Sequence, residues 1–263
     1  MKILFVGDIV ARIGRKTVIK LLPDLIKKEK VDFVIANGEN STTGNGMTKE
    51  TMQDLIDAGV DFFTSGNHIW KKAEFVSELD NPKVPVIRPA NYPEGTPGRG
   101  WEIVENPFGN IAIINLLGLE GYLNAYLDSP FKKLDQILDT IQDKAKIIIA
   151  DFHADITSEK VAFGLYGDGK VSAVIGTHTH VPTCDARILP KGTAVVTDVG
   201  MVGPQNTSLG VKANIVIGRF LTALPKKHEN PTEGPVWFHS VLMEIDKDGK
   251  AKSITRIDLD SEI

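Results

Sequence analysis

The segment Ile3-Leu4-Phe5-Val6-Gly7-Asp8 joins a short apolar run to a glycine and an acidic residue. Such a run is typical of a buried strand in a parallel sheet. The same order of apolar run and polar motif recurs four more times: Phe33-Val34-Ile35-Ala36 before Gly38-Glu39-Asn40, Phe62-Phe63-Thr64 before Gly66-Asn67-His68, Ile147-Ile148-Ile149-Ala150 before Asp151-Phe152-His153, and Ala173-Val174-Ile175 before Gly176-Thr177-His178-Thr179-His180. Because ligands bind at the carboxyl ends of strands in α/β sheets, we expect these side chains to converge at one shared edge.

Amphipathic segments separate the early strands. Residues 18–26 carry apolar side chains at helical spacing, and Thr48 is a predicted N-cap of a second helix that ends at Gly59. This alternation of strands and helices implies parallel strands joined by right-handed crossovers.

The later pattern favours antiparallel pairing. Residues 101–104 and 111–115 read as a hairpin, residues 131–141 as an amphipathic helix, and residues 186–189, 194–197, 236–245 and 253–259 as strands, with exposed loops at 95–100 and 225–235. We therefore predict an α/β fold in a single domain, residues 1–263, in which two packed mixed sheets lie between helices as a four-layer α/β/β/α sandwich.

Composition limits the possible partners and compartment. A net charge of −4 argues against a protein that coats duplex DNA, because such binding depends on many phosphate contacts from clustered lysine and arginine. The single cysteine, Cys184, fits a reducing compartment and excludes a cysteine-rich zinc module. No apolar stretch approaches the roughly 20 residues of a membrane span, so we expect a cytoplasmic protein without a membrane partner.

The polar motifs supply carboxylate, amide and imidazole groups but no thiolate. This donor set favours Mn, Fe, Co, Ni or Zn in open coordination over a closed structural zinc. The candidate metal ligands are Asp8, Glu39, Asn40, Asn67, His153, His178 and His180.

The spacing within two motifs suggests how the side chains point. In an extended segment alternate side chains share a face, so His178 and His180 are expected to face the cluster together. Adjacent side chains diverge, so if Asn67 is a ligand then His68 can project towards a substrate as a proton donor or charge stabiliser.

In order and strand context, the Gly-Asp, Gly-Asn-His and Gly-x-His-x-His motifs resemble those of the calcineurin-like binuclear metallophosphoesterases. Three departures stand out: Asp8-Ile9-Val10 replaces Asp-x-His, Glu39 replaces the usual bridging aspartate, and no acid follows Asn67-His68. These departures are the pattern of one branch, the YmdB-like phosphodiesterases. Further matches to that branch are Asp151-Phe152-His153-Ala154, residues 186–193 and Thr197-Asp198-Val199-Gly200-Met201.

The resemblance implies a ligand set for two divalent metal ions, iron or manganese. Asp8, Glu39, Asn40 and His180 would surround one ion, and Glu39, Asn67, His153 and His178 the other, with Glu39 bridging. Asn40 would take the place of the histidine missing from the first motif.

The resemblance also implies hydrolysis of 2′,3′-cyclic, and possibly 3′,5′-cyclic, nucleotides. Hydroxide formed from water shared by the metals would attack phosphorus, and His68 would assist the leaving oxygen. RNA ends are further possible substrates, and the chain could be an oligomer.

Other classes of protein stay open. A metal- or nucleotide-binding regulator with little turnover would also fit the depleted first motif, whereas a scaffold would not require so many polar groups at one edge.

Several residues have two interpretations. Asp151 and Asp155 could orient an imidazole or cap a loop, Asp198 could bind backbone or face the site, and Arg12 and Arg15 could hold phosphate or be solvated. His228 and His239 are expected to be structural or solvated, and Trp70 to pack. The segments 42–46 and 120–124 could shape the rim of a pocket.

Overall fold

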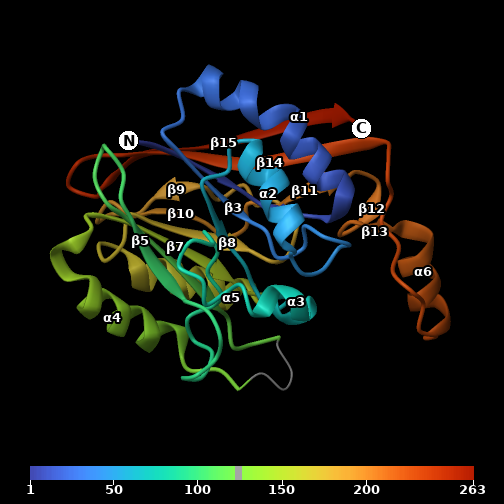
Figure 1. Cartoon of the computed structure of the whole chain (residues 1–263), viewed down its shortest axis with the longest axis horizontal. Coiled ribbons are helices and arrows are strands. Elements are labelled where there is room, and N and C mark those ends of the chain that lie inside the picture. The colour runs from blue at the N-terminus through green and yellow to red at the C-terminus, as the bar shows by residue number, and fades with distance from the viewer. Residues whose placement is uncertain (122–125) are drawn as a thin grey trace.

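The computed structural model describes residues 1–121 and 126–263. Two mixed sheets pack face to face, with helices on both outer sides (Figure 1). The first sheet contains β1 (Lys2–Val6), β2 (Asp8–Ile9), β3 (Phe33–Asn37), β4 (Phe62–Thr64), β11 (Met201–Pro204), β14 (Pro235–Ile245) and β15 (Ala251–Glu262). The second sheet contains, in spatial order, β5 (Trp101–Val104), β6 (Ile111–Leu117), β7 (Ile147–His153), β8 (Ala173–Thr177), β10 (Ala194–Val196) and β9 (Arg187–Ile188).

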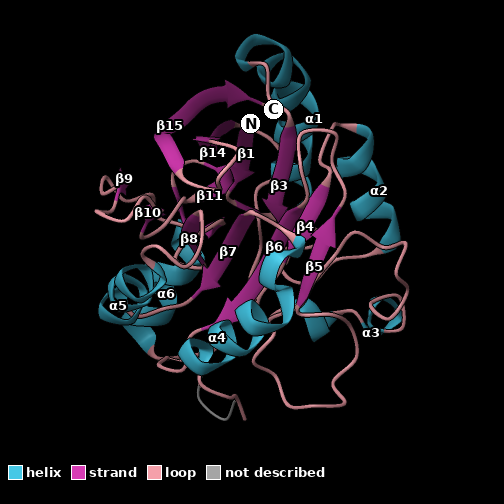
Figure 2. Cartoon of the chain, turned by 90° about the vertical axis from the view of Figure 1, so that its left-hand side faces the viewer, coloured by secondary structure: helices cyan, strands magenta, loops and turns pink. Residues whose placement is uncertain are grey.

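The helical segments are α1 (Ala11–Glu29), α2 (Lys49–Asp57), η1 (Ile69–Lys71), α3 (Ala73–Val76), α4 (Pro130–Ile141), η2 (Gln142–Lys144), α5 (Thr157–Gly167) and α6 (Ala213–Thr222). Helices α1 and α2 cover one side of the strands, and α4 and α5 cover the other (Figure 2). None of the described helices is both long and apolar enough to cross a membrane.

Alternation along the strands builds three apolar layers. On β1, Ile3 and Phe5 face the second sheet, where they pack with residues such as Ile113 and Ile149. The intervening Leu4 and Val6 face α1 and α2, because successive side chains of a strand point to opposite faces. A third cluster joins the second sheet to α4 and α5. The predicted four-layer α/β/β/α sandwich is therefore confirmed.

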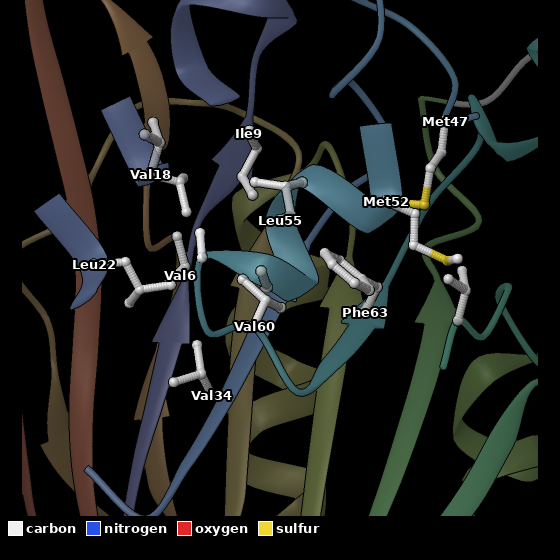
Figure 3. Packing of buried hydrophobic residues seen from close by; sticks show 14 of the residues in the cluster. Val6, Ile9, Val18, Leu22, Val34, Met47, Met52, Leu55, Val60 and Phe63 are labelled. Carbon is white, nitrogen blue, oxygen red and sulfur yellow. The ribbon is translucent and has the colours of Figure 1, made fainter. Parts of the chain in front are cut away.

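Figure 3 shows the layer between the first sheet and its helices. Burial of this apolar area is the main force that holds α1 and α2 in place. The residues labelled there are Val6, Ile9, Val18, Leu22, Val34, Met47, Met52, Leu55, Val60 and Phe63.

Most local predictions are confirmed. The Thr48 hydroxyl accepts a hydrogen bond from the amide of Thr51 and caps α2, which ends two residues before Gly59. β5 and β6 form the predicted antiparallel hairpin, and β14 and β15 form a long one. The segment 225–234 lies outside helices and strands, as expected for an exposed loop.

Three features differ from the sequence prediction. The five ligand-bearing strands do not belong to one sheet: β1, β3 and β4 lie in the first sheet, whereas β7 and β8 lie in the second. β10 pairs in parallel with β8 as well as antiparallel with β9. The C-terminal third also contains α6, β11 and a small hairpin of β12 (Thr207–Ser208) and β13 (Val211–Lys212), which the apolar pattern did not predict.

β14 has an unusual place in the first sheet. Its residues 240–244 pair with β1 and residues 236–238 pair with β11, while its whole length pairs with β15. β1 and β11 therefore follow one another along the same side of β14. This arrangement places Asp8 in β2, beside Met201 of β11, at the end of the sandwich where the other motifs gather.

Candidate metal centre

The predicted ligands come together where strands from both sheets end. Asp8 follows β1 through Gly7, Glu39 and Asn40 follow β3, Asn67 follows β4, His153 ends β7, and His178 and His180 follow β8. Asp8, Glu39, Asn40 and His153 are at most 2% exposed, and the other three are half-buried. Polar groups buried this close together require hydrogen bonds or bound ions, because removing them from water without such interactions costs free energy.

Glu39 lies at the centre of the cluster. Its Oε1 atom is 3.2 Å from His153 Nε2 and 3.2 Å from Asn40 Nδ2, so one carboxylate contacts two different groups of side chains. Its Oε2 atom accepts a hydrogen bond of 3.0 Å from the backbone amide of His68.

The remaining donors divide into two groups around Glu39. On one side, His153 Nε2 lies 3.0 Å from His178 Nδ1 and 3.3 Å from Asn67 Oδ1. On the other side, His180 Nε2 lies 3.2 Å from Asn40 Nδ2 and 3.8 Å from Asp8 Oδ1. These two groups contain the same side chains as the ligand sets that the family resemblance implied, and metal binding by them stays a prediction.

The His-x-His segment reaches the cluster by a different route from the one predicted. His178 and His180 have φ angles of 97° and 65°, in the left-handed region that residues with a Cβ rarely occupy, so the segment is not extended. Hydrogen bonds hold this conformation: the amide of His178 donates to Asp8 Oδ2, and His180 Nδ1 donates to the carbonyl of Leu209. The two imidazoles do face the cluster, but the reasoning from strand alternation was wrong.

Asn67 and His68 diverge as expected, although both contact the cluster. Asn67 faces His153, whereas His68 Nδ1 lies 2.7 Å from Asn40 Oδ1 and 3.4 Å from Glu39 Oε1. The His68 side chain is 31% exposed and lines the cleft described below. It is therefore accessible to a bound molecule while its Nδ1 atom is held by the cluster.

A buried network orients His153 from behind. The hydroxyl of Thr177 lies 2.9 Å from His153 Nδ1 and donates a hydrogen bond of 2.7 Å to Asp151, which also accepts one from Asn37. Asp151 thus acts on the imidazole through Thr177, one of the two roles considered from the sequence. The roles of Thr177 and Asn37 were missed, although Thr177 lies within one of the recognised motifs and Asn37 directly precedes another.

A second buried network fixes the loop that carries His178 and His180. Lys160 of α5 is 4% exposed, and its Nζ atom lies 2.6 Å from Asp198 and 2.6 Å from the carbonyl of Thr177. Asp198 in turn accepts hydrogen bonds from the backbone and hydroxyl of Thr179 and from the amide of Gly200. Asp198 is therefore a backbone-binding group, and Lys160 was not predicted.

Burial and neighbouring charge set the protonation of the cluster. Burial raises the pKa of Asp8 well above its usual value, whereas for Glu39 the His153 and His68 imidazoles overcome burial and hold the pKa far below its usual range. Burial alone would lower the pKa of His153, but the Glu39, Asp8 and Asp151 carboxyls raise it to about 9. Burial, reinforced by His153, lowers the pKa of His178 to about 2. The neighbouring carboxyls thus favour the protonated form of His153 when no cation is bound.

Three further observations indicate that these donor side chains could hold a cation. Asp8 Oδ1 is buried without a hydrogen-bond partner among the described residues. A Cβ atom added at Gly66 would lie 2.3 Å from both Glu39 Oε2 and His153 Nε2, so the glycine leaves the space beside these atoms open. The donor atoms of Glu39, His153 and His178 all lie within 4.8 Å of one another. Nitrogen and oxygen donors of this kind suit first-row transition metals.

The cluster opens into a cleft of about 360 Å³, a size typical of ligand sites. The residues that line it include Glu39, Asn40, His68, His178 and His180 of the cluster, together with Leu209 and residues of β13 and α6. Gly44, from the segment 42–46 predicted to shape a rim, also lines the cleft, as do Asp155 and His228.

Other candidates are placed as follows. Glu120 and Gly121 of the second predicted rim are exposed, whereas Tyr122–Asn124 lie outside the described residues. Arg15 binds the carbonyls of Ser41 and Thr42 and so stabilises the loop after Asn40, and Arg12 is exposed. Trp70 packs edge-on against Tyr92, and His239 stacks on Trp237. His228 is exposed, as expected for a solvated residue, and it also lines the cleft.

Together, the sandwich fold and the donor cluster at its end define a metallophosphoesterase. The chain belongs to the YmdB-like protein family, whose model matches residues 4–257. It is 46% identical over 259 residues to the 2′,3′-cyclic-nucleotide 2′-phosphodiesterase of Bacillus subtilis (strain 168), covering 98% of this chain and 96% of that one.

Two solved structures have the same fold. A novel phosphatase from Mycoplasma pneumoniae superposes with a TM-score of 0.93 at 34% identity, covering 100% of this chain and 94% of that one. A hypothetical protein from Thermus thermophilus superposes with a TM-score of 0.91 at 38% identity, covering 99% of both chains.

Proposed function

We propose that this chain is a phosphodiesterase that hydrolyses 2′,3′-cyclic nucleotides with two divalent metal ions, iron or manganese. The observation that carries the proposal is the position of Glu39, a buried carboxylate that contacts two groups of nitrogen and oxygen donors beside an open cleft. The activity of the 46% identical relative supports the substrate class. We propose that the whole chain, residues 1–263, acts as one domain.

Under this proposal Asp8, Glu39, Asn40 and His180 would hold one ion, and Glu39, Asn67, His153 and His178 would hold the other. When bound, such ions would lower the pKa of a water molecule and neutralise charge on the phosphoryl oxygens. Thr177 keeps the His153 ring oriented by its contact with Nδ1. The buried position of the donors excludes bulk water from one side of the phosphate, which strengthens electrostatic interactions there.

His68 is the proposed proton donor to the leaving oxygen. Its Nδ1 atom is directed to Asn40 Oδ1, which leaves Nε2 to face the substrate. Burial lowers the pKa of free His68. A bound phosphodiester adds a negative charge beside the ring, and a nearby opposite charge favours the protonated form.

The test is hydrolysis of 2′,3′-cyclic AMP by metal-stripped protein, with Mn²⁺ or Fe²⁺ added back. Asn67→Ala should lose metal-dependent turnover, whereas Asn110→Ala, an exposed asparagine that contacts Lys144 far from the cluster, should retain it. His68→Ala should still bind metal but turn over about 10²- to 10⁴-fold more slowly, the usual range for general acid catalysis.

Metal binding without any turnover by the unmodified chain would contradict the proposal. That result would favour a metal- or nucleotide-binding regulatory protein. The same assay with RNA that ends in a 2′,3′-cyclic phosphate would decide whether RNA ends are also substrates.

A further inference from the structure

Helix α6 presents an unusual amount of apolar surface. None of its residues is buried, and Phe220 and Leu221 are 83% and 80% exposed. The helix projects from the body of the protein beside β12 and β13 (Figure 1). Exposed apolar groups of this size, gathered on one short element, often mark a binding surface.

Helical spacing divides these side chains between two faces. Arg219 and Phe220 follow Val216 by three and four residues, so both lie on its side of the helix, and all three line the cleft. Ile217 and Leu221 share another face and do not line the cleft. The exposed ring of Phe220 thus belongs to the same cleft as the metal donors.

The lining of the cleft contains two kinds of side chain. Glu39 and the histidines are polar and suit a phosphate with metal ions. Leu209, Val211, Val216 and Phe220, here called the apolar wall, are apolar, and Ser208 and Arg219 also line the cleft. Among the described residues no carboxylate forms an ion pair with Arg219, so it adds positive charge to the cleft.

Hydrogen bonds fix the apolar wall relative to the donors. The carbonyl of Leu209 accepts a hydrogen bond of 3.2 Å from Nδ1 of His180, a proposed ligand. Asn230 donates to the carbonyl of Gly210, and the amide of Lys212 donates to the carbonyl of Glu229. The β12–β13 hairpin therefore ties α6 to the metal centre on one side and to the returning chain on the other.

We propose that Phe220, supported by Val216, is a stacking platform for the nucleobase of the substrate. This inference rests on the proposed function, because the phosphate must lie at the metal donors for the base to extend to the apolar wall. Stacking on an aromatic ring tolerates every base, since each base has a π-face, and the wall offers few groups that could read base edges. The site should therefore accept all four 2′,3′-cyclic nucleotides with similar efficiency.

The test compares 2′,3′-cyclic AMP with a base-free substrate, methyl β-ribofuranoside 2′,3′-cyclic phosphate. Phe220→Ala should lower kcat/KM for 2′,3′-cyclic AMP by about 5- to 100-fold, mainly through KM, because base stacking contributes in this range. Hydrolysis of the base-free substrate should be unchanged. Phe220→Trp should retain activity towards both substrates.

Leu221→Ala is the matched control, because Leu221 is equally exposed on the same helix but lies outside the cleft. It should leave both substrates unaffected. An unchanged kcat/KM for 2′,3′-cyclic AMP in Phe220→Ala would overturn the inference. An equal fall in kcat/KM for both substrates would also overturn it, because the effect would then not depend on the base. A fall in kcat/KM in Leu221→Ala, accompanied by a change of molecular mass in light scattering, would overturn it by showing that α6 packs against a second copy of the chain.

A failure of the proposed function gives a different result, namely no turnover of either substrate by the unmodified chain. Calorimetric binding of adenosine 3′-monophosphate then tests the platform by itself. An affinity about tenfold weaker in Phe220→Ala than in the unmodified chain would support it, and equal affinities would overturn it.

Discussion

Replacing Lys160 by methionine is expected to destabilise the fold strongly. The side chains of Lys160 and Asp198 are 2% and 1% exposed, and their charged atoms lie 2.6 Å apart. Methionine preserves most of the side-chain volume but leaves the Asp198 carboxylate buried without a cation. Removal of one partner of a buried ion pair costs about 3–5 kcal/mol.

The matched control is Lys170→Met. Lys170 pairs with Asp135 at 2.8 Å, but these side chains are 37% and 45% exposed. Exposed pairs contribute only about 0.2–1 kcal/mol because solvent screens them. Both lysines thus form an ion pair with an aspartate, and the two pairs differ in how deeply they are buried.

Urea denaturation of metal-free protein, followed by circular dichroism, measures the free energy of unfolding of both variants. Adding Asp198→Asn to Lys160→Met removes the uncompensated charge, so the double variant should recover part of the lost stability. Equal losses in Lys160→Met and Lys170→Met, or no recovery in the double variant, would refute the reasoning from burial.

Three further outcomes are expected. Gly66→Ala should abolish Mn²⁺ binding in calorimetry, because the added Cβ would lie 2.3 Å from His153 Nε2. Gly164→Ala is the control and should bind Mn²⁺ normally, because its added Cβ would lie no closer than 3.5 Å to any other atom. Thr177→Val removes the hydroxyl between His153 and Asp151, so Mn²⁺ affinity should fall by about 10- to 100-fold, and an unchanged titration would contradict this role. Finally, the pKa of His153 is raised from 6.5 to about 9. Protonated His153 therefore stabilises the metal-free protein fully below pH 6.5, and this stabilisation is lost as the pH rises through 9. The free energy of unfolding in chelator should thus fall over this interval while Mn²⁺ affinity rises, and a flat profile in both measurements would exclude this linkage.

The sequence predicts local structure and the donor residues well. Apolar runs such as Ile147–Ala150 form buried strands, and this can be predicted because it depends on the apolar side chains within the run. Pairing partners are harder to predict: Lys2 of β1 lies opposite Glu244 of β14, and no local pattern records a contact between residues so far apart in sequence. The division of the five ligand-bearing strands between two sheets was missed for this reason.

The parts of the site that were missed also have physical reasons. Lys160 looks like an ordinary helix lysine until Asp198 is placed beside it, and Thr177 looks like an ordinary strand residue. Helix α6 has β-branched residues, Gly218 inside it and no side-chain cap at its start, all of which weaken a helical pattern. Its place beside the cleft follows from tertiary contacts alone.

The position of β14 has a consequence for the order in which the protein is made. The antiparallel neighbour of β1 is β14, which is synthesised more than two hundred residues after it. Until then one side of β1 has unpaired backbone groups, and β11 has no strand to connect it with β1. The first sheet can close only after β14 has been synthesised, so we expect slow folding dominated by long-range contacts and a need for protection of the nascent chain from aggregation.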